Sequence, residues 1–488
     1  MTALRIAPLL ALLLSGVATV AGAQNARNEL PDIGTPADAV LNRGEEFNIG
    51  LMVVRGLRDQ GQILDDPEVA DYLQSLGSRV AAQTGDAGQS FQYFVVRDAD
   101  INAFALPGGF IGVNQGLILA TANESQLASV LAHETAHVTQ RHIARSLRQQ
   151  GRTGLASAAA LLAAILIGAA GGGGAMEGAI AIAQGAAQQQ TINFTRANEE
   201  EADRVGITFL AAAGFDPQGM ADFFETLSRR NTLSSPTQYI PALLQSHPVN
   251  SDRIAESRER ASQYPRTRTP ESLSYAFARE RVRVVSATAD ADLRPYYQSR
   301  RQNRMLTAAE RYGEALAVAQ AGQRDEAVTA LRELGRKFPT LPLIQSSLGQ
   351  VLADSGHSEE ALNTLASAVA VSPRNVPLSI RYAEALMRAG RNSDAHNLLL
   401  DLFNNVPPTP SQIRLIALAA SAAGDSGDAY FYMGEYHVTS GDLPLAVNQL
   451  ELALAAPNIT PVQRARYAAR MKEIRDALQD SARRGSRS

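Results

Sequence analysis

Ser129–His142, with the sequence SVLAHETAHVTQRH, holds three of the seven histidines in a chain of 488 residues. His133, Glu134 and His137 form the pattern H-E-x-x-H. Residues i and i+4 share one face of a helix, so both imidazoles can point at one zinc ion. Glu134 then lies beside the metal, where it can take a proton from a water molecule. The alternative is a surface helix that carries its histidines by chance.

A catalytic zinc site needs a third protein ligand. His142 follows His137 by five residues and lies on another face of a continuous helix, so we predict that it is not a ligand. The segment NFTRANEEEADRVG is the candidate for the second half of the site, since Glu199 and Asp203 share a helix face. A carboxylate there can reach the metal, and Asp203 can orient a ligand histidine. The alternative is a solvated acidic helix face.

The composition excludes several other functions. A net charge of −4 gives no basic footprint for nucleic acid. The absence of cysteine excludes disulfides, thiolate zinc sites and a cysteine nucleophile. Any metal must therefore be held by nitrogen and oxygen atoms.

Residues 1–23 are typical of a signal peptide. Arg5 supplies the positive charge, an apolar run follows, and the small residues AGA end at Ala23. We predict cleavage after Ala23 and export, with a bacterial periplasm as the destination. An uncleaved membrane anchor is the alternative.

The region before the histidines predicts β structure. Residues 90–120 alternate apolar and polar side chains around a Pro-Gly-Gly break at 107–109, which indicates a small hairpin or meander. Residues 124–149 are predicted to be helical. Residues 267–304 are charged and irregular in composition, as expected of a connection between domains.

The C-terminal third repeats with a period of 34 residues. Alanines follow the repeated glycines by five residues and prolines follow the first three by seventeen, which is the tetratricopeptide pattern. Gly441 comes only 17 residues after the last of these glycines, so the frame shifts by one helix. A generic helical bundle is the alternative. The repeated residues are Gly322, Gly356, Gly390 and Gly424; Ala327, Ala361, Ala395 and Ala429; and Pro339, Pro373 and Pro407.

In combination, the motifs HETAH, EEEAD, NAFALPGG and SHPVNSDR resemble those of the gluzincin metallopeptidases, the family of the CAAX prenyl proteases and the HtpX heat-shock proteases. The exported, repeat-bearing form is similar to the β-barrel assembly-enhancing proteases of bacterial periplasms. The resemblance implies a zinc metalloendopeptidase with one Zn2+ ion per chain. His133, His137 and Glu199 are then the ligands, with Glu134 as the base and Asp203 as a supporting catalytic carboxylate.

The resemblance also assigns residues outside the two helices. His247 matches a family histidine near the metal, which either stabilises the oxyanion or occupies the open position in a resting state. Arg253 matches a family arginine whose role the sequence does not give. Asn102, Ala103, Phe104 and Ala105 are expected to form an edge strand that holds an extended peptide substrate.

Residues 153–176 carry no charge and are long enough to be considered as a membrane span. They lie between the two halves of the metal site, however, and a single crossing would separate Glu199 from His133. We therefore expect a flap over the cleft, with possible peripheral membrane contact.

The predicted fold is mostly α: an α+β zincin-like domain with a small β-sheet, followed by an α-helical tetratricopeptide solenoid. The expected segments are a signal peptide (1–23), a zinc metallopeptidase domain (24–270), a connection (271–305), repeats (306–460), and a C-terminal helix and tail (461–488).

The expected function is quality control and assembly of outer-membrane proteins, with the repeats binding substrates or assembly partners. The alternative is a largely non-proteolytic chaperone or adaptor with a latent zinc site.

Overall fold

The computed structural model describes residues 41–149, 196–233, 241–265, 272–288 and 290–485. The predicted signal peptide and the predicted flap at 153–176 lie outside these ranges. The N-terminal unit consists of α1 (Arg43–Asp59), α2 (Pro67–Ala81), β1 (Gln92–Val96), β2 (Ala103–Leu106), the 3-10 turn η1 (Pro107–Gly109), β3 (Phe110–Asn114), α3 (Gln115–Ala120), α4 (Glu124–Thr139), α5 (His142–Gln149), α8 (Arg196–Ala212), α9 (Gln218–Leu233), α10 (Ala242–Ser246) and α11 (Ser251–Ser262).

The sheet has the order β1-β3-β2. β2 and β3 form the expected antiparallel hairpin, but β1 pairs with β3 in parallel, so a meander was the wrong reading. The turn between β2 and β3 needs Gly109, which has a φ of 89° and no room for a Cβ, because Ser90 O would lie 2.1 Å away. Because β3 lies between the other two strands, β2 is an edge strand of the described sheet.

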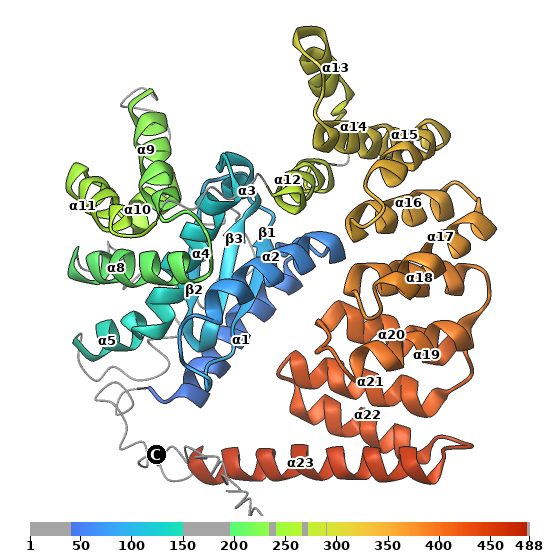
Figure 1. Cartoon of the computed structure of the whole chain (residues 1–488). Helices are drawn as coiled ribbons and strands as arrows, with labels where there is room; N and C mark the ends of the chain where they lie inside the picture. The colour runs from blue at the N-terminus through green and yellow to red at the C-terminus, as the bar shows by residue number, and fades with distance from the viewer. Residues whose placement is uncertain (1–40, 150–195, 234–240, 266–271, 289, 486–488) are drawn as a thin grey trace, which may run out of the picture.

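Helices cover both faces of the sheet. Side chains of β1 alternate between two apolar clusters, as the period of a strand requires. Tyr93 and Val95 join the core formed with α2 and α4, whereas Phe94 joins a second core with α1. The sheet thus fixes α4, which carries the H-E-x-x-H motif, against the centre of the unit (Figure 1).

The helix predicted for residues 124–149 is broken. α4 ends at Thr139, and Arg141 adopts a φ of 51° before α5 begins at His142. The Arg141 guanidinium donates a hydrogen bond of 2.5 Å to Leu41 O and pairs with Glu46 at the start of α1. These contacts stabilise the bend at Arg141, where the chain leaves α4.

Residues 271–305, the expected connection between domains, contain α12 (Leu273–Val285) and α13 (Arg294–Asn303). Two charged side chains of α12, Glu280 and Arg281, are buried. Arg281 of α12 is 1% exposed and binds Asp66 at the N-terminus of α2 with distances of 2.7 and 2.8 Å. α12 is therefore part of the packing between the two halves of the chain.

The C-terminal half confirms the tetratricopeptide prediction. The repeated glycines and Gly441 all have φ values between 73° and 89° and end helices, as a left-handed C-cap requires. Ala327, Ala361, Ala395 and Ala446 are fully buried between helices. The helices are α14 (Ala308–Gln320), α15 (Arg324–Lys337), α16 (Pro342–Asp354), α17 (Ser358–Val371), α18 (Val376–Arg388), α19 (Asn392–Phe403), α20 (Pro410–Ala422), α21 (Ser426–Thr439), α22 (Leu443–Ala455) and α23 (Pro461–Gly485).

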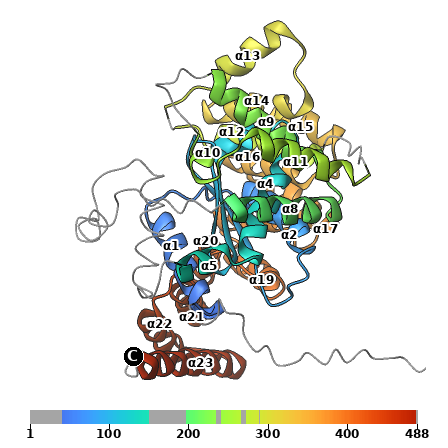
Figure 2. The same cartoon turned by 90° about the vertical axis from the view of Figure 1, so that its left-hand side faces the viewer.

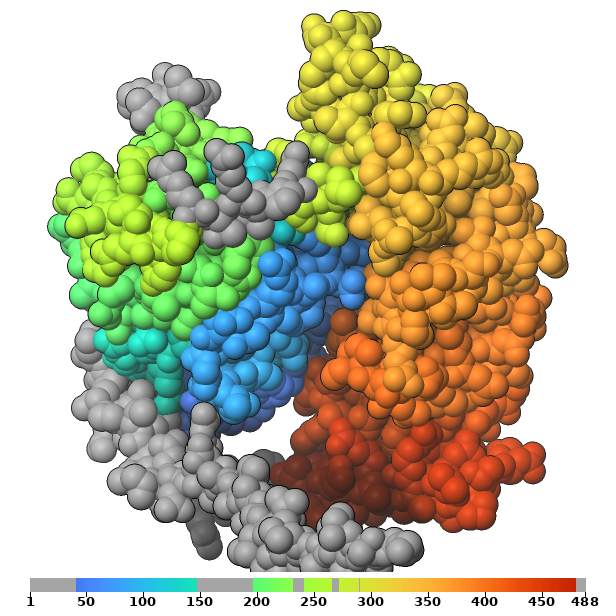
Figure 3. All heavy atoms as spheres, in the orientation of Figure 1, coloured from blue at the N-terminus to red at the C-terminus, as the bar shows by residue number. Residues whose placement is uncertain are grey.

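The repeats curve beside the N-terminal unit (Figure 1 and, turned by 90°, Figure 2). The two halves meet where α2 packs against α12 and α18, and where Ser346 of α16 donates a hydrogen bond to Glu68 of α2. Below that contact, the space-filling view shows a hollow between the blue N-terminal unit and the red C-terminal repeats (Figure 3). None of the helices in the described ranges has the length and apolar composition that crossing a bilayer requires.

Candidate metal centre

The H-E-x-x-H motif lies on α4 in the centre of the N-terminal unit. The Asn123 side chain caps the helix by accepting a hydrogen bond from the Gln126 amide. His133, Glu134 and His137 are 5%, 0% and 2% exposed. The helix is buried on nearly every side, which explains why its sequence shows little amphipathic pattern.

α8 supplies the second half of the site and crosses α4 at close range. A Cβ on Gly206 would lie 3.2 Å from the backbone atoms of Ala132 and His133. The glycine therefore lets the two helix backbones approach beside the first histidine. This approach buries Glu199 and Asp203, which are 2% and 5% exposed.

Four side chains converge on one point: His133, His137, Glu199 and His247, with one donor atom from each within 4.8 Å of the others. The Nε2 atoms of the two α4 histidines are 3.0 Å apart. Both face Glu199, at distances of 3.4 and 3.5 Å. His247, the C-cap of α10, brings its Nδ1 atom to 2.9 Å from Glu199 Oε1.

A second layer of polar groups holds the outward ring nitrogens of the α4 histidines. Asp203 Oδ1 lies 2.9 Å from His133 Nδ1. His142 Nδ1 lies 2.9 Å from His137 Nδ1, and its own Nε2 lies 3.2 Å from Glu201. Such partners fix the orientation of ligand imidazoles.

Arg253, at the start of α11, connects this layer to the His247 turn. Its guanidinium donates two hydrogen bonds to Asp203, of 2.7 and 2.8 Å, and forms an ion pair of 3.0 Å with Glu199. It also donates a hydrogen bond of 2.7 Å to Pro248 O, the residue after His247. One side chain therefore holds two carboxylates and the turn that carries the fourth donor.

The electrostatics of the cluster favour a cation. Burial alone would lower the pKa of His133, but Asp203 and Glu199 outweigh it and raise the pKa to about 10. Burial and the neighbouring His133 hold the pKa of His137 well below its usual value. Burial opposes ionisation of Glu199, yet the adjacent histidines keep its pKa low.

The donor set fits a divalent metal ion. Glu134 is completely buried, yet neither of its carboxylate oxygens has a hydrogen-bond partner in the described part of the chain. His247 Nε2 lies 3.8 Å from Glu134 Oε1, too far to donate a hydrogen bond. A buried carboxylate without a hydrogen bond is costly, so a cation or a water molecule would stabilise it. A cavity of about 20 Å³, the size of one water molecule, lies against Glu134, His133 and His247. Nitrogen and carboxylate donors of this kind suit zinc.

The structure therefore brings together all six predicted catalytic and ligand residues. Of the expected substrate strand, Ala103–Leu106 forms β2, and Asn102 lies just before it with a buried side-chain oxygen that has no partner among the described residues. The contact of His142 with His137 was not predicted, because the two residues were expected to lie on one continuous helix. The glycine of EEEADRVG was the signal for the close helix crossing.

Residues 67–261 match Peptidase family M48, and residues 352–421 match the tetratricopeptide repeat. A relative from Vibrio cholerae, whose name contains the words beta-barrel assembly-enhancing protease, is 34% identical over 96% of both chains. The beta-barrel assembly-enhancing proteases of Yersinia pestis and Escherichia coli are 32% and 31% identical, over 95% and 96% of each chain. Because these relatives cover nearly its whole length, the chain belongs to peptidase family M48, in the branch of metallopeptidases that carry tetratricopeptide repeats.

Proposed function

We propose that the protein is a periplasmic zinc endopeptidase that acts on outer-membrane β-barrel proteins during their assembly. The observation that carries the proposal is the buried carboxylate of Glu134, which has no hydrogen-bond partner among the described residues and lies beside four convergent donor groups. The names of the full-length relatives support the assignment of clients. The N-terminal pattern of a cleaved signal peptide, with its end at Ala23, supports the location.

We assign the zinc ligands to His133, His137 and Glu199. When bound, zinc polarises the scissile carbonyl and makes a water molecule more acidic. Glu134 takes a proton from the attacking water and passes it to the leaving amine. Asp203 holds the His133 ring through Nδ1, and His247 donates a hydrogen bond to the oxyanion.

The substrate chain is proposed to pair with β2. Backbone groups on the free edge of β2, at residues 102–105, would bind an extended peptide through main-chain hydrogen bonds. The metallopeptidase unit is assigned to residues 24–270, the connection to 271–305 and the repeats to 306–460. The repeats would hold substrates or assembly partners on their inner surface.

One observation favours a second function, that of a chaperone or adaptor with a latent site. His247 Nδ1 lies 2.9 Å from Glu199 and completes a set of four protein donors. A closed site with four protein ligands is typical of structural zinc, since catalytic sites keep one position open. In this latent form, the repeats would provide the chaperone or adaptor activity. The peptidase would become active only when His247 moves away from the metal site.

The test is the Glu134→Gln variant, which removes the proton acceptor and keeps every proposed ligand. Purified full-length protein is incubated with an unfolded outer-membrane β-barrel protein, and fragments are followed by gel electrophoresis. We expect cleavage to fall by at least about a thousandfold in the variant. Glu200→Gln, on the exposed face of α8, is the matched control and should keep full activity.

Equal cleavage by the Glu134→Gln variant would contradict the peptidase assignment. His247→Ala separates the two functions. A rise in cleavage identifies a latent enzyme, whereas a fall identifies His247 as part of the catalytic machinery.

A further inference from the structure

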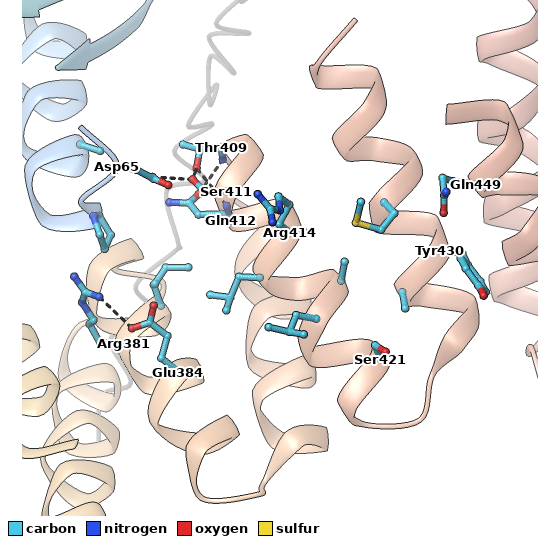
Figure 4. A pocket seen from close by; sticks show the side chains of 18 of the residues that line it. Asp65, Arg381, Glu384, Thr409, Ser411, Gln412, Arg414, Ser421, Tyr430 and Gln449 are labelled. Atoms are coloured by element: carbon cyan, nitrogen blue, oxygen red, sulfur yellow. Dashed lines mark hydrogen bonds and ion pairs between the residues drawn. The ribbon is translucent and has the colours of Figure 1, made fainter. Parts of the chain in front are cut away.

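One contact around the metal centre joins two imidazole rings, and its direction depends on where their protons lie. Most polar pairs of the chain have fixed roles. In the groove between α2, α18 and α20, for example, Arg381 donates a hydrogen bond to Glu384, because a guanidinium cannot accept and an ionised carboxylate cannot donate (Figure 4). His137 Nδ1 and His142 Nδ1 lie 2.9 Å apart, and either nitrogen can carry the proton between them. The neighbours of this pair therefore decide which ring donates.

His142 is completely buried and links the two helices that form the metal site. Its ring packs edge-on against the ring of His137 on α4, with centroids 4.8 Å apart and planes at 78°. Its Nε2 atom lies 3.2 Å from Oε2 of Glu201 on α8. The same carboxylate oxygen accepts a hydrogen bond of 2.9 Å from Arg145. Both ring nitrogens of His142 thus face a polar atom at hydrogen-bonding distance.

The assigned ligand role of His137 fixes the direction of these bonds. A neutral imidazole carries one proton, so a ring whose Nε2 atom binds a metal carries its proton on Nδ1. His137 Nδ1 then donates, and His142 Nδ1 must accept. The proton of His142 is left on Nε2, where the ionised carboxylate of Glu201 accepts it. The reverse direction would put a proton on His137 Nε2 and block the metal.

We propose that His142 is a positioning residue: Glu201 holds its proton on Nε2, so that its Nδ1 accepts a hydrogen bond from His137 and turns the Nε2 atom of that ring towards the metal. The inference rests on the proposed function, because it takes His137 as a zinc ligand. It adds the residue that sets the proton position of this ligand, and the carboxylate that sets the proton position of His142 in turn.

The two ligands on α4 are supported differently. His133 Nδ1 lies 2.9 Å from a carboxylate oxygen of Asp203, whereas His137 reaches a carboxylate only through the ring of His142. A carboxylate partner raises the basicity of a ligand imidazole, and a neutral ring does so less. His137 is therefore the ligand whose orientation depends on α5.

The acidic run at the start of α8 divides into three roles. Successive residues of a helix are about 100° apart, so three neighbouring glutamates face different directions. Glu199 lies among the metal donors, and Glu201 lies against His142. Glu200 between them is exposed and pairs with Arg196. Glu200 and Glu201 consequently offer a matched pair of positions for an experiment.

The first test is the zinc affinity of the full-length protein, measured by competition with a chelator. His142→Leu fills the site without an acceptor and should bind zinc about 10–100-fold more weakly than the wild type. His142→Asn places an amide oxygen near the position of Nδ1 and should recover most of the affinity. His396→Leu, which replaces a 6% exposed histidine on α19, is the control for loss of a buried ring and should bind as the wild type does.

The glutamate is tested in the same titration. Glu201→Gln should weaken zinc binding by about threefold to tenfold, because its amide oxygen still accepts a hydrogen bond but carries no charge. Glu200→Gln removes the same charge one residue away and should leave the affinity unchanged.

Nuclear magnetic resonance reports the direction of the bond in the wild-type protein without any substitution. The chain has seven histidines, so a long-range proton–nitrogen spectrum of the zinc-loaded protein, labelled with heavy nitrogen in histidine alone, contains few signals. We expect a proton on Nδ1 of His137 and on Nε2 of His142. The spectrum of His142→Asn identifies the His142 signals by their loss.

The outcomes separate this inference from the function on which it rests. Wild-type protein that binds no zinc would contradict the proposed function, and the inference with it. Where the wild type binds zinc, the inference alone is overturned by equal affinity in His142→Leu, by an Asn variant no better than the Leu variant, or by a proton on His142 Nδ1. Equal affinities in Glu201→Gln and Glu200→Gln would likewise remove Glu201 from the account.

Discussion

The metal centre and the junction between the two halves both bury charged side chains, but they differ in how completely those charges are paired. At the junction, Arg281 and Arg381 face Asp66 and Glu68, and every one of these charges has a partner. At the metal centre, Glu199 and Asp203 share the guanidinium of Arg253, and Glu134 has no hydrogen-bond partner among the described residues.

Neutral polar groups also satisfy the buried charges at the junction. Tyr312 and Ser347 accept hydrogen bonds from Arg281, and Ser346 donates one to Glu68. These contacts complete the junction without any added ion. Burial of charge alone therefore does not identify a site; a buried carboxylate left without a hydrogen bond beside converging donor groups does. The comparison predicts that metal removal affects one cluster and not the other.

The largest expected effect is the loss of metal in Glu199→Gln. Zinc binding to a four-donor site is worth about 10–16 kcal/mol, so the loss of one charged donor should weaken binding at least about a hundredfold. The measurement is a competition titration of metal-depleted protein with a chelator. Glu200→Gln should bind as the wild type does, and retained affinity in Glu199→Gln would show that this carboxylate is not a ligand.

Glu68→Gln should destabilise the packing between the two halves of the chain and leave the metal centre intact. Removal of one partner from a buried ion pair costs about 3–5 kcal/mol, and two guanidinium groups lose their partner here. We expect a lower urea midpoint with unchanged metal content. The exposed Glu259→Gln is the control, and a normal midpoint in Glu68→Gln would contradict the account.

The same variant has a predictable pH dependence. Burial disfavours the charged form of Glu68, but Arg281 and Arg381 outweigh burial and lower its pKa from 4.5 to about 2. The stabilising contribution is therefore present above the unfolded value and is lost as the pH falls from about 4.5 towards about 2. The difference in urea midpoint between wild type and Glu68→Gln should be large at about pH 7 and small near pH 2.

Arg253→Lys should weaken metal binding by about 10–100-fold, as is usual when a group that orients the ligands is altered. A lysine keeps the charge but cannot make two parallel hydrogen bonds to Asp203 and also reach Pro248 O. The chelator competition measures this effect. Arg145→Lys, on the more exposed Glu201 pair, is the control, and equal losses in both variants would argue against a special role for Arg253.

The smallest effect is expected for Gly206→Ala. The added methyl group would force α8 away from α4 by a few tenths of an ångström, at a cost of about 1–2 kcal/mol. Gly56→Ala in α1, where nothing lies within 4 Å of the new Cβ, should instead be neutral or stabilising. A stabilised Gly206→Ala variant would show that the helix crossing is looser than the structure indicates.

The sequence revealed the metal centre well because its main pairs are local. His133 and His137, and Glu199 and Asp203, are each one helical turn apart, and helix periodicity alone puts each pair on one face. The 34-residue repeat was equally visible, since its glycines require a left-handed backbone at each turn. The fold class was therefore predicted correctly.

The features that were missed depend on tertiary structure. His142 reaches His137 only because the helix breaks at Arg141, and that break depends on contacts with α1. The junction pairs join residues 215 and 313 positions apart, so no local pattern reports them. The charged composition of residues 267–304 consequently indicated only a connection between domains.

X-ray absorption spectroscopy at the zinc edge, on the full-length protein reconstituted with zinc, tests the central claim most directly. The account predicts one zinc ion per chain with only nitrogen and oxygen donors, and with the scattering of two imidazoles in the open site or of three when His247 closes it. His247→Ala should give two imidazoles in either case. A zinc-free protein, or a spectrum with one imidazole or none, would contradict the assignment of His133, His137 and Glu199 to one metal centre.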